Sequence, residues 1–159
     1  MSDDATLITQ WNRLSRVHRR IEAQMERRLH QHLGLGVSEF YALQTLREGV
    51  RAGTGLLYLN DLADGIGLSQ SATSRLVTRL RDRGLITTHT SPHDRRSVEI
   101  ELTALAHDVL QLGSPLLQQA VEEVVRQLGA DNSDEDLLRY LRGSRDDPAQ
   151  PDDRQVPAH

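Results

Sequence analysis

The stretch that most limits the possible folds of this chain is residues 60–103, where two helical patterns are followed at once by two β patterns. Asn60 is a good N-cap for a short helix that Gly67 ends, and Ser69 caps a second helix that stops at Gly84. Two helices joined by a tight glycine turn form a helix-turn-helix. The stretch therefore predicts this motif just ahead of a β structure.

The β structure is predicted to be a two-stranded hairpin. Residues 85–90 (LITTHT) and 97–103 (SVEIELT) are rich in Thr, Ile and Val, and in the second run apolar residues alternate with Glu99 and Glu101. A helix-turn-helix followed by a hairpin is a winged helix, in which the hairpin is the wing. We assign residues 37–103 to this domain and predict a mainly α fold.

Further helices are predicted around the motif. Apolar residues recur at close to heptad spacing over residues 7–29, which indicates a long amphipathic helix that ends near Gly34. A shorter helix over residues 38–48 and a small strand within 56–59 should follow. A second apolar stripe over residues 105–128 predicts another long helix, which contains a proline.

The apolar stripes over residues 7–29 and 105–128 are too long for one winged helix to cover. The simplest arrangement is a two-fold homodimer, in which the first and last helices of two chains bury each other's apolar faces. We therefore assign residues 1–36 and 104–143 to a dimerisation region that includes a last short helix within 133–143. Residues 144–159 hold three Pro and no packing periodicity, so we expect a disordered tail.

Charge is distributed unevenly along the chain. The formal net charge is −4, yet residues 69–96 hold six Arg against two Asp, whereas residues 131–153 hold eight acidic side chains against three Arg. All 19 basic residues are Arg, whose planar fork suits phosphates and guanine edges. The basic segment coincides with the helix-turn-helix and the wing, which favours nucleic acid as the partner.

The second helix of the motif has two contrasting faces. Its apolar residues fall within one arc of about 140°, and the opposite face carries short hydroxyl side chains and an Arg. Such a face can approach base edges in a major groove, while cations at the tip of the hairpin can reach a minor groove or phosphates. The residues predicted to contact DNA are Ser69, Gln70, Ser71, Ser74, Arg75, Thr78, Arg79, His93, Arg95 and Arg96.

The segment LADGIGLSQSATSRLVTRLRDRGLI, followed by SPHDRRSVEIELT, resembles the MarR family of winged-helix transcription regulators. The family's commonest wing motif reads Asp-x-Arg-Asp-x-Arg; Asp94 and Arg96 match it here, whereas Ser91 and His93 depart from it. The resemblance implies that Asp94 pairs with Arg96 and stabilises the wing. It also implies a homodimer that binds a palindromic site in double-stranded DNA, as repressors of this family do.

The resemblance further implies a small, often aromatic or phenolic effector held between the dimerisation helices and the winged helix. Aromatic and hydrogen-bonding groups suit such a ligand. The candidate lining residues are Trp11, Arg16, His18 and Tyr41. A place in the dimer core explains Trp11 better than a place in the ligand site does.

Catalysis is not expected. Ser91, His93 and Asp94 share a single tight turn, which cannot hold a Ser-His-Asp relay. The sequence has no Walker-type phosphate loop, no HExxH and no Cys. We therefore predict a protein that is not an enzyme and needs no cofactor.

Two other functions remain open. The first is zinc sensing, for which the candidate ligands are Glu22, Glu26, His30, His32, Glu39 and His107. Residues at i and i+2 do not share a helix face, so histidines at a polar rim explain most of these positions better, and we predict no metal site. The second is a winged-helix module that binds protein and not DNA.

The location of the protein can also be predicted. The chain has no Cys, no charge-free apolar run long enough to span a bilayer, and an acidic N-terminus (MSDDATL) unlike a signal peptide. We therefore expect a soluble cytoplasmic protein.

Overall fold

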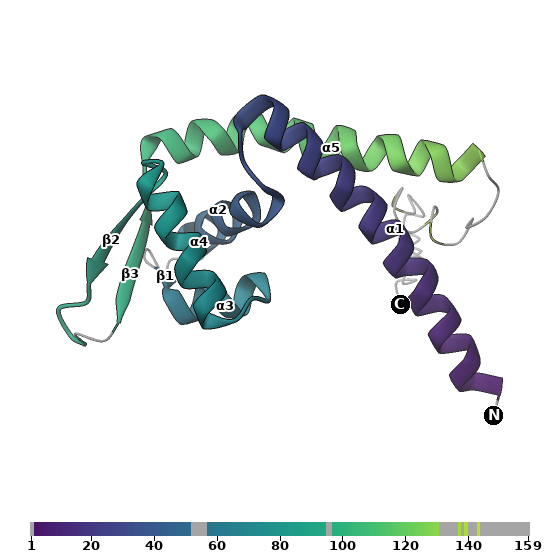
Figure 1. Cartoon of the computed structure of the whole chain (residues 1–159), viewed down its shortest axis with the longest axis horizontal. Coiled ribbons are helices and arrows are strands. Elements are labelled where there is room, and N and C mark those ends of the chain that lie inside the picture. The colour runs from purple at the N-terminus through teal and green to yellow at the C-terminus, as the bar shows by residue number, and fades with distance from the viewer. Residues whose placement is uncertain are drawn as a thin grey trace, which may run out of the picture. The chain divides into compact units, whose positions relative to one another are not determined.

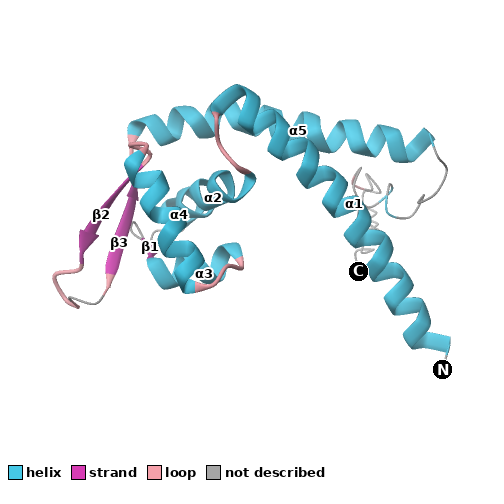
Figure 2. Ribbon diagram, viewed as in Figure 1, coloured by secondary structure: helices cyan, strands magenta, loops and turns pink. Residues whose placement is uncertain are grey.

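The computed structural model describes residues 2–51, 57–94 and 97–130, together with residues 137, 139 and 143. Within these ranges the fold is mainly α, as predicted, with a small sheet (Figures 1 and 2). The elements in order are α1 (Ser2–Leu33), α2 (Val37–Arg51), β1 (Leu57–Tyr58), α3 (Leu59–Ile66), α4 (Gln70–Asp82), β2 (Ile86–Thr90), β3 (Val98–Leu102) and α5 (Ala104–Ala130).

The chain divides into two compact units, residues 1–124 and 125–159, and the fold described below is that of the first unit. None of the helices in the described ranges combines the length and the apolar character needed to cross a membrane. The short helix expected within 133–143 and the tail expected over 144–159 lie outside the described residues, apart from the isolated positions named above.

The sheet has three antiparallel strands in the order β1-β3-β2. The predicted hairpin is confirmed, with Ile86 opposite Leu102 and Thr90 opposite Val98. The short strand predicted within 56–59 is also confirmed, and its Leu57 pairs with Ile100 on the other edge of β3. Because β3 is the central strand, the wing is tied through β1 to the start of α3.

The helical core is centred on α2. Phe40, Leu43 and Leu46 of this helix are almost completely buried, in one cluster with apolar residues of the other four helices and of β2 and β3. Gly113 of α5 lies directly against the Phe40 ring, since a Cβ at Gly113 would be 2.1 Å from Phe40 Cε2. Helix α2 therefore connects α4, the second helix of the helix-turn-helix, to the long helix α5.

The start of α3 differs from the prediction. Tyr58, and not Asn60, occupies the N-cap position, and the Tyr58 backbone N–H donates to the Asp61 carboxylate at 3.4 Å. The reason lies in the tertiary structure. Pairing with Glu99 holds Tyr58 in an extended conformation, and the chain passes directly from strand to helix.

The other predicted boundaries of the motif are confirmed. The Ser69 hydroxyl accepts a hydrogen bond from the Ala72 N–H at 3.3 Å, as an N-cap should. Gly67 adopts the left-handed conformation with φ 68°, which ends α3. Helix α5 continues through Pro115 as one helix.

Candidate nucleic-acid interface

The recognition helix α4 turns its predicted contact face outward. All seven candidate residues between 69 and 79 are exposed, while Leu76, Val77 and Leu80 are buried as predicted. Thr73 is fully buried as well, because its hydroxyl donates to the Ser69 carbonyl at 2.9 Å and so needs no solvent. Thr78 makes the same kind of bond to Ser74, which leaves the Thr78 methyl for contacts outside the helix.

A groove of about 720 Å³ lies between the start of α4 and the sheet. It brings together four of the predicted contact residues at the start of α4 and residues at the base of the wing, and none of the described residues that line it is charged. Its lining residues are Tyr58, Leu59, Asn60, Ser69, Gln70, Ser71, Ser74, Ser97 and Val98. The groove thus presents amide and hydroxyl groups, which can both donate and accept hydrogen bonds.

The turn of the wing is organised by hydrogen bonds that the sequence did not reveal. Ser91 is buried, and its backbone N–H donates to the Ser97 carbonyl at 2.9 Å. The Ser97 hydroxyl donates to Asp94 Oδ2 at 2.9 Å, and the His93 N–H donates to the Ser91 hydroxyl at 3.3 Å. Asp94 therefore accepts a hydrogen bond from Ser97 within the turn, and its role in stabilising the wing stays a prediction.

The tip of the wing remains a prediction. His93 is exposed, as a DNA contact must be. Arg95 and Arg96 lie outside the described residues, so the pairing of Asp94 with Arg96 and the contacts expected of both arginines are not tested.

Arg79 has a protein partner. Its Nε donates to Glu39 Oε1 at 3.2 Å, and Arg83 Nη1, one turn further along α4, lies 3.5 Å from Glu39 Oε2. Arg83 also donates to the Gly34 carbonyl at 2.6 Å, at the end of α1. We call Glu39, Arg79 and Arg83 the Glu39 cluster. It ties the recognition helix to the junction of α1 and α2, so Arg79 has a structural role that its position in the motif did not indicate.

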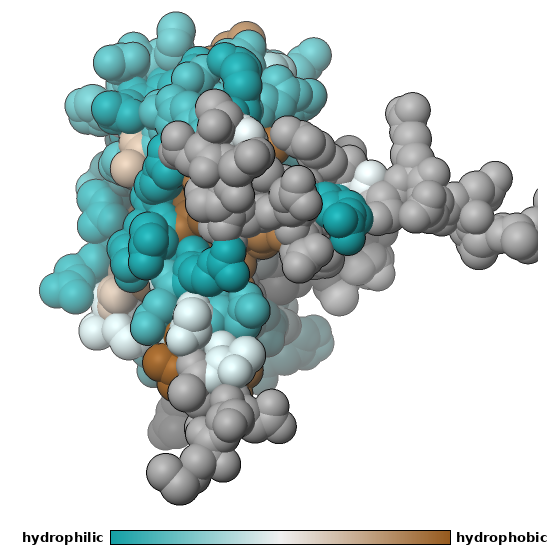
Figure 3. Space-filling model, turned by 90° about the vertical axis from the view of Figure 1, so that its right-hand side faces the viewer, coloured by the Kyte–Doolittle hydropathy of each residue, from teal (hydrophilic) through white to brown (hydrophobic). Residues whose placement is uncertain are grey.

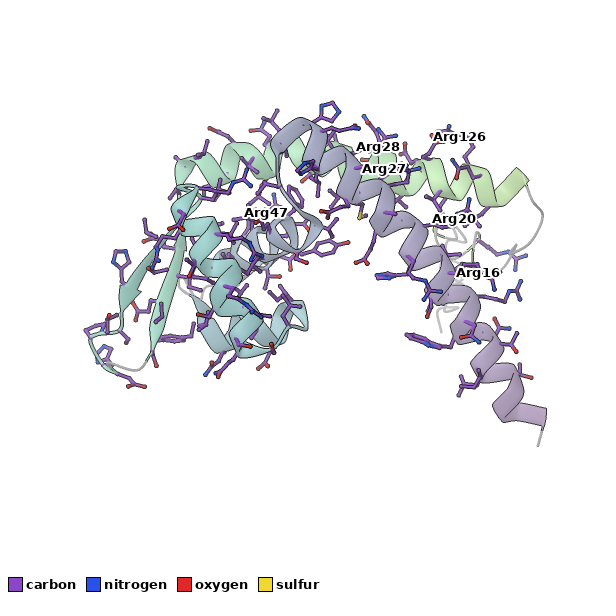
Figure 4. All side chains as sticks on the ribbon, viewed as in Figure 1. Arg16, Arg20, Arg27, Arg28, Arg47 and Arg126 are labelled. Atoms are coloured by element: carbon purple, nitrogen blue, oxygen red, sulfur yellow. The ribbon has the colours of Figure 1, made fainter. Side chains whose placement is uncertain are left out.

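A second cavity, of about 500 Å³, contains two of the four predicted effector residues. His18 and Tyr41 line it, whereas Trp11 and Arg16, which lie on α1 (Arg16 is labelled in Figure 4), are not among its lining residues. The lining residues are His18, Glu22, Ser38, Tyr41, Gln44, Thr45, Glu48, Gly65, Ile66 and Leu68.

Tyr41 is the aromatic side chain of this cavity. Its hydroxyl donates to Met25 Sδ at 3.3 Å. Burial, and to a smaller extent the charge of Glu22, raises the pKa of Tyr41 above its ordinary value, so the phenol stays protonated and able to donate. His18 Nε2 lies 3.6 Å from Glu22 Oε1.

The zinc-sensing alternative finds no support in the described part of the chain. There, no group of three or more His, Cys, Asp or Glu side chains is placed to hold a metal ion. Glu26, His30 and Glu39 do line one small cavity, but Arg79 and Arg83 line it too. The Glu39 carboxylate already accepts hydrogen bonds from both guanidiniums.

Comparisons with known proteins agree with this architecture. The MarR family model matches residues 33–97. The transcriptional regulator BldR from Sulfolobus solfataricus is 24% identical over 89% of this chain and 96% of its own, with a TM-score of 0.70. A mutant of MarR from E. coli complexed with operator DNA is 20% identical over 86% of this chain and 93% of its own (TM-score 0.66). BpsR from Bordetella bronchiseptica, whose DNA binding is regulated by 6-hydroxynicotinic acid, is 21% identical over 81% of this chain and 84% of its own (TM-score 0.64).

The family match covers α2, the helix-turn-helix and the first half of the wing, and the shared fold extends over both long helices. The matched proteins include several transcriptional regulators. The chain described here therefore has a winged helix-turn-helix fold, and its residues 33–97 match the model of the MarR family.

Proposed function

We propose that this protein is a sequence-specific DNA-binding repressor that acts as a homodimer on a palindromic operator. The observation that carries the proposal is the exposed hydroxyl and arginine face of α4, which borders a groove beside the wing whose described lining residues include amide and hydroxyl side chains. Short polar side chains on a helix suit base edges in a major groove. Two solved proteins of this fold are complexed with DNA, which adds support.

A dimer would place two copies of this face on one side of a duplex. Residues 37–103 would form the DNA-binding domain, and residues 1–36 and 104–143 the dimerisation region. Recognition helices related by a two-fold axis meet successive major grooves about 34 Å apart. Selection of binding sites from a random duplex library should therefore enrich an imperfect palindrome with half-sites about 10 bp apart. A reporter gene behind the enriched site should be less active when the protein is present.

The apolar faces of the long helices support the dimer. Leu7, Ile8, Trp11 and Leu14 of α1 are 46–68% exposed, and Leu105 and Leu112 of α5 are 51% and 63% exposed. Apolar atoms also reach the surface among hydrophilic ones in Figure 3. Large apolar side chains exposed along one helix stripe mark a surface that another protein covers.

Trp11→Asp should convert the dimer into a monomer at micromolar concentration, because it places a charge in the apolar stripe. Sedimentation velocity measures the change. Asn12→Asp adds the same charge to an exposed neighbouring position and should leave the dimer intact. If the two variants sediment alike, the result contradicts a dimer interface at Trp11.

Arg75→Ala should weaken binding to the selected duplex by about 1–3 kcal/mol, since Arg75 is exposed in the middle of the contact face. Fluorescence anisotropy at one fixed salt concentration measures the loss. Arg19→Ala removes the same charge from an exposed position of α1 and serves as the control. A loss of the same size in both variants would show that Arg75 contributes only general charge.

We also propose that the cavity around Tyr41 binds a small aromatic effector that releases the DNA. The precedent is BpsR, in which 6-hydroxynicotinic acid regulates the binding of DNA. Glu22 and Glu48 both line the cavity here, so a neutral aromatic ligand should bind better than an aromatic acid.

Tyr41→Phe should weaken the binding of phenol about fivefold, because it removes the Tyr41 oxygen, which can accept one hydrogen bond worth about 1 kcal/mol from the ligand while its own proton is donated to Met25. Titration calorimetry with phenol and with benzoate checks both expectations. Tyr58→Phe, at an exposed tyrosine outside the cavity, is the matched control. Tighter binding of benzoate than of phenol would rule out the charge argument.

A further inference from the structure

A side-chain amide pair joins the two helices of the helix-turn-helix at the contact face. Gln70 Nε2, at the first residue of α4, donates a hydrogen bond to Asn60 Oδ1, on the first turn of α3. Both side chains are exposed, and both line the groove beside the wing. The bond therefore lies at the surface that the proposed function places against DNA.

The chemistry of an amide shows what this bond leaves unused. A glutamine amide has one acceptor oxygen and two N–H donors. Gln70 uses one N–H for Asn60, so its oxygen and its second N–H remain, side by side on the same planar group. The adenine edge in the major groove offers the complementary pair, an N6 donor and an N7 acceptor. Guanine offers two acceptors there and cannot satisfy the Gln70 oxygen.

The position of Asn60 is itself well defined. Tyr58, two residues earlier, pairs with Glu99 in the sheet, and the Tyr58 N–H donates to the Asp61 carboxylate. Asn60 is therefore carried on backbone that both the sheet and the helix hold in place. A long, flexible glutamine side chain gains most from such a partner, because ordering it before binding lowers the entropy cost of reading a base.

The neighbouring hydroxyls are less free to read a base. The Ser69 hydroxyl accepts from the Ala72 N–H and lies 3.3 Å from the Ser71 hydroxyl. A serine hydroxyl can also rotate to either donate or accept, so it distinguishes bases poorly. Gln70, with a planar donor and acceptor held in one orientation, is the better candidate for base discrimination at this end of α4.

We propose that Asn60 is a positioning residue that orients the Gln70 amide to read one adenine in each half-site. The proposal rests on the proposed function and adds to it a target base and a residue outside the predicted contact set. The pair could instead serve only to tie α3 to α4, and the experiment separates these roles through base preference, which a purely structural bond would not change.

The experiment starts from the duplex that the wild-type protein selects. Each base pair of a half-site is exchanged in turn, and binding is measured by anisotropy for wild type, Asn60→Ala, Gln70→Ala and the double variant. Both single variants should lose about tenfold of the preference for adenine at one shared position. The double variant should lose no more than either single variant. Thermal unfolding and binding to a scrambled duplex should stay close to wild type.

Two further measurements identify which atoms of the adenine and of residue 60 take part in the proposed contact. Replacing the adenine by 7-deazaadenine removes N7 and should weaken wild-type binding about tenfold but leave Gln70→Ala unaffected. Asn60→Asp keeps an acceptor for the Gln70 N–H, so it should retain the adenine preference even though its charge weakens binding to every duplex. Asp64→Ala changes another exposed position of α3 and is the matched control for the Asn60 variants.

The possible failures are distinct. If wild type selects no site and binds no duplex, the proposed function and this inference both fall. If wild type selects a palindrome but Asn60→Ala keeps the full base preference, only the inference falls. The same holds if Asn60→Ala and Gln70→Ala alter different positions of the half-site, or if 7-deazaadenine has no effect on wild type.

Discussion

Gly113→Ala should destabilise the fold by about 2–3 kcal/mol, although alanine is normally the better helix residue by about 1 kcal/mol. The added Cβ would lie 2.1 Å from Phe40 Cε2 and 2.6 Å from Phe40 Cζ. Phe40 is completely buried in the core cluster, so its ring has no free space to occupy. Either α5 moves away from α2 or the ring is displaced, and both lose packing.

Urea unfolding at one fixed protein concentration measures this effect, because the stability of a dimer depends on concentration. Combining Gly113→Ala with Phe40→Leu removes the ring atoms that clash. The double variant should therefore be less destabilised than the sum of the two single variants predicts. An alanine variant as stable as wild type would show that α5 and α2 are not in close contact at Gly113.

Glu39→Ala should lower the free energy of unfolding by about 2–3 kcal/mol, because it removes the carboxylate that two arginines of α4 share. The Glu39 side chain is only 12% exposed and also accepts a hydrogen bond from the Gly36 N–H at 3.1 Å. The Arg79 and Arg83 side chains are 57% and 40% exposed, and water can solvate them after the change. For this reason the cost should stay below that of breaking a fully buried ion pair.

Glu48→Ala removes the same charge from an exposed position of the same helix and is the control. It should change the free energy of unfolding by about 0.5 kcal/mol or less. If Glu39→Ala and Glu48→Ala are equally stable, the Glu39 cluster contributes nothing beyond surface charge. If Glu39→Ala is less stable, DNA binding by the still-folded variant then tests whether the cluster also orients α4.

Most of the fold could be predicted because its signals are local. The N-cap at Ser69 and the left-handed turn at Gly67 act on backbone within four residues, so the sequence around them identified the helix-turn-helix. The alternation in β3 likewise indicated the hairpin. Asn60 was assigned wrongly as an N-cap because the pairing of Tyr58 with a distant strand decides where α3 begins.

The candidate site was predictable in its residues but not in its partners. The exposed face of α4 follows from helical periodicity, and the structure confirms that these side chains are exposed. Periodicity could not show that Arg79 is engaged by Glu39, forty residues earlier, because that contact depends on how α2 packs against α4. For the same reason it could not show that Ser97 donates a hydrogen bond to Asp94, or that two of the four proposed effector residues do not line the 500 Å³ cavity of Tyr41.

The sequence by itself determined the order of the elements, the motif and the outward face of the recognition helix, since capping, glycine conformation and apolar spacing all act over a few residues. Only the tertiary structure decided that β1 joins the wing to α3, that Asn60 holds Gln70 and that Glu39 anchors α4. The first and third of these contacts join elements far apart in sequence, and all three depend on how the elements pack around the core that contains Phe40.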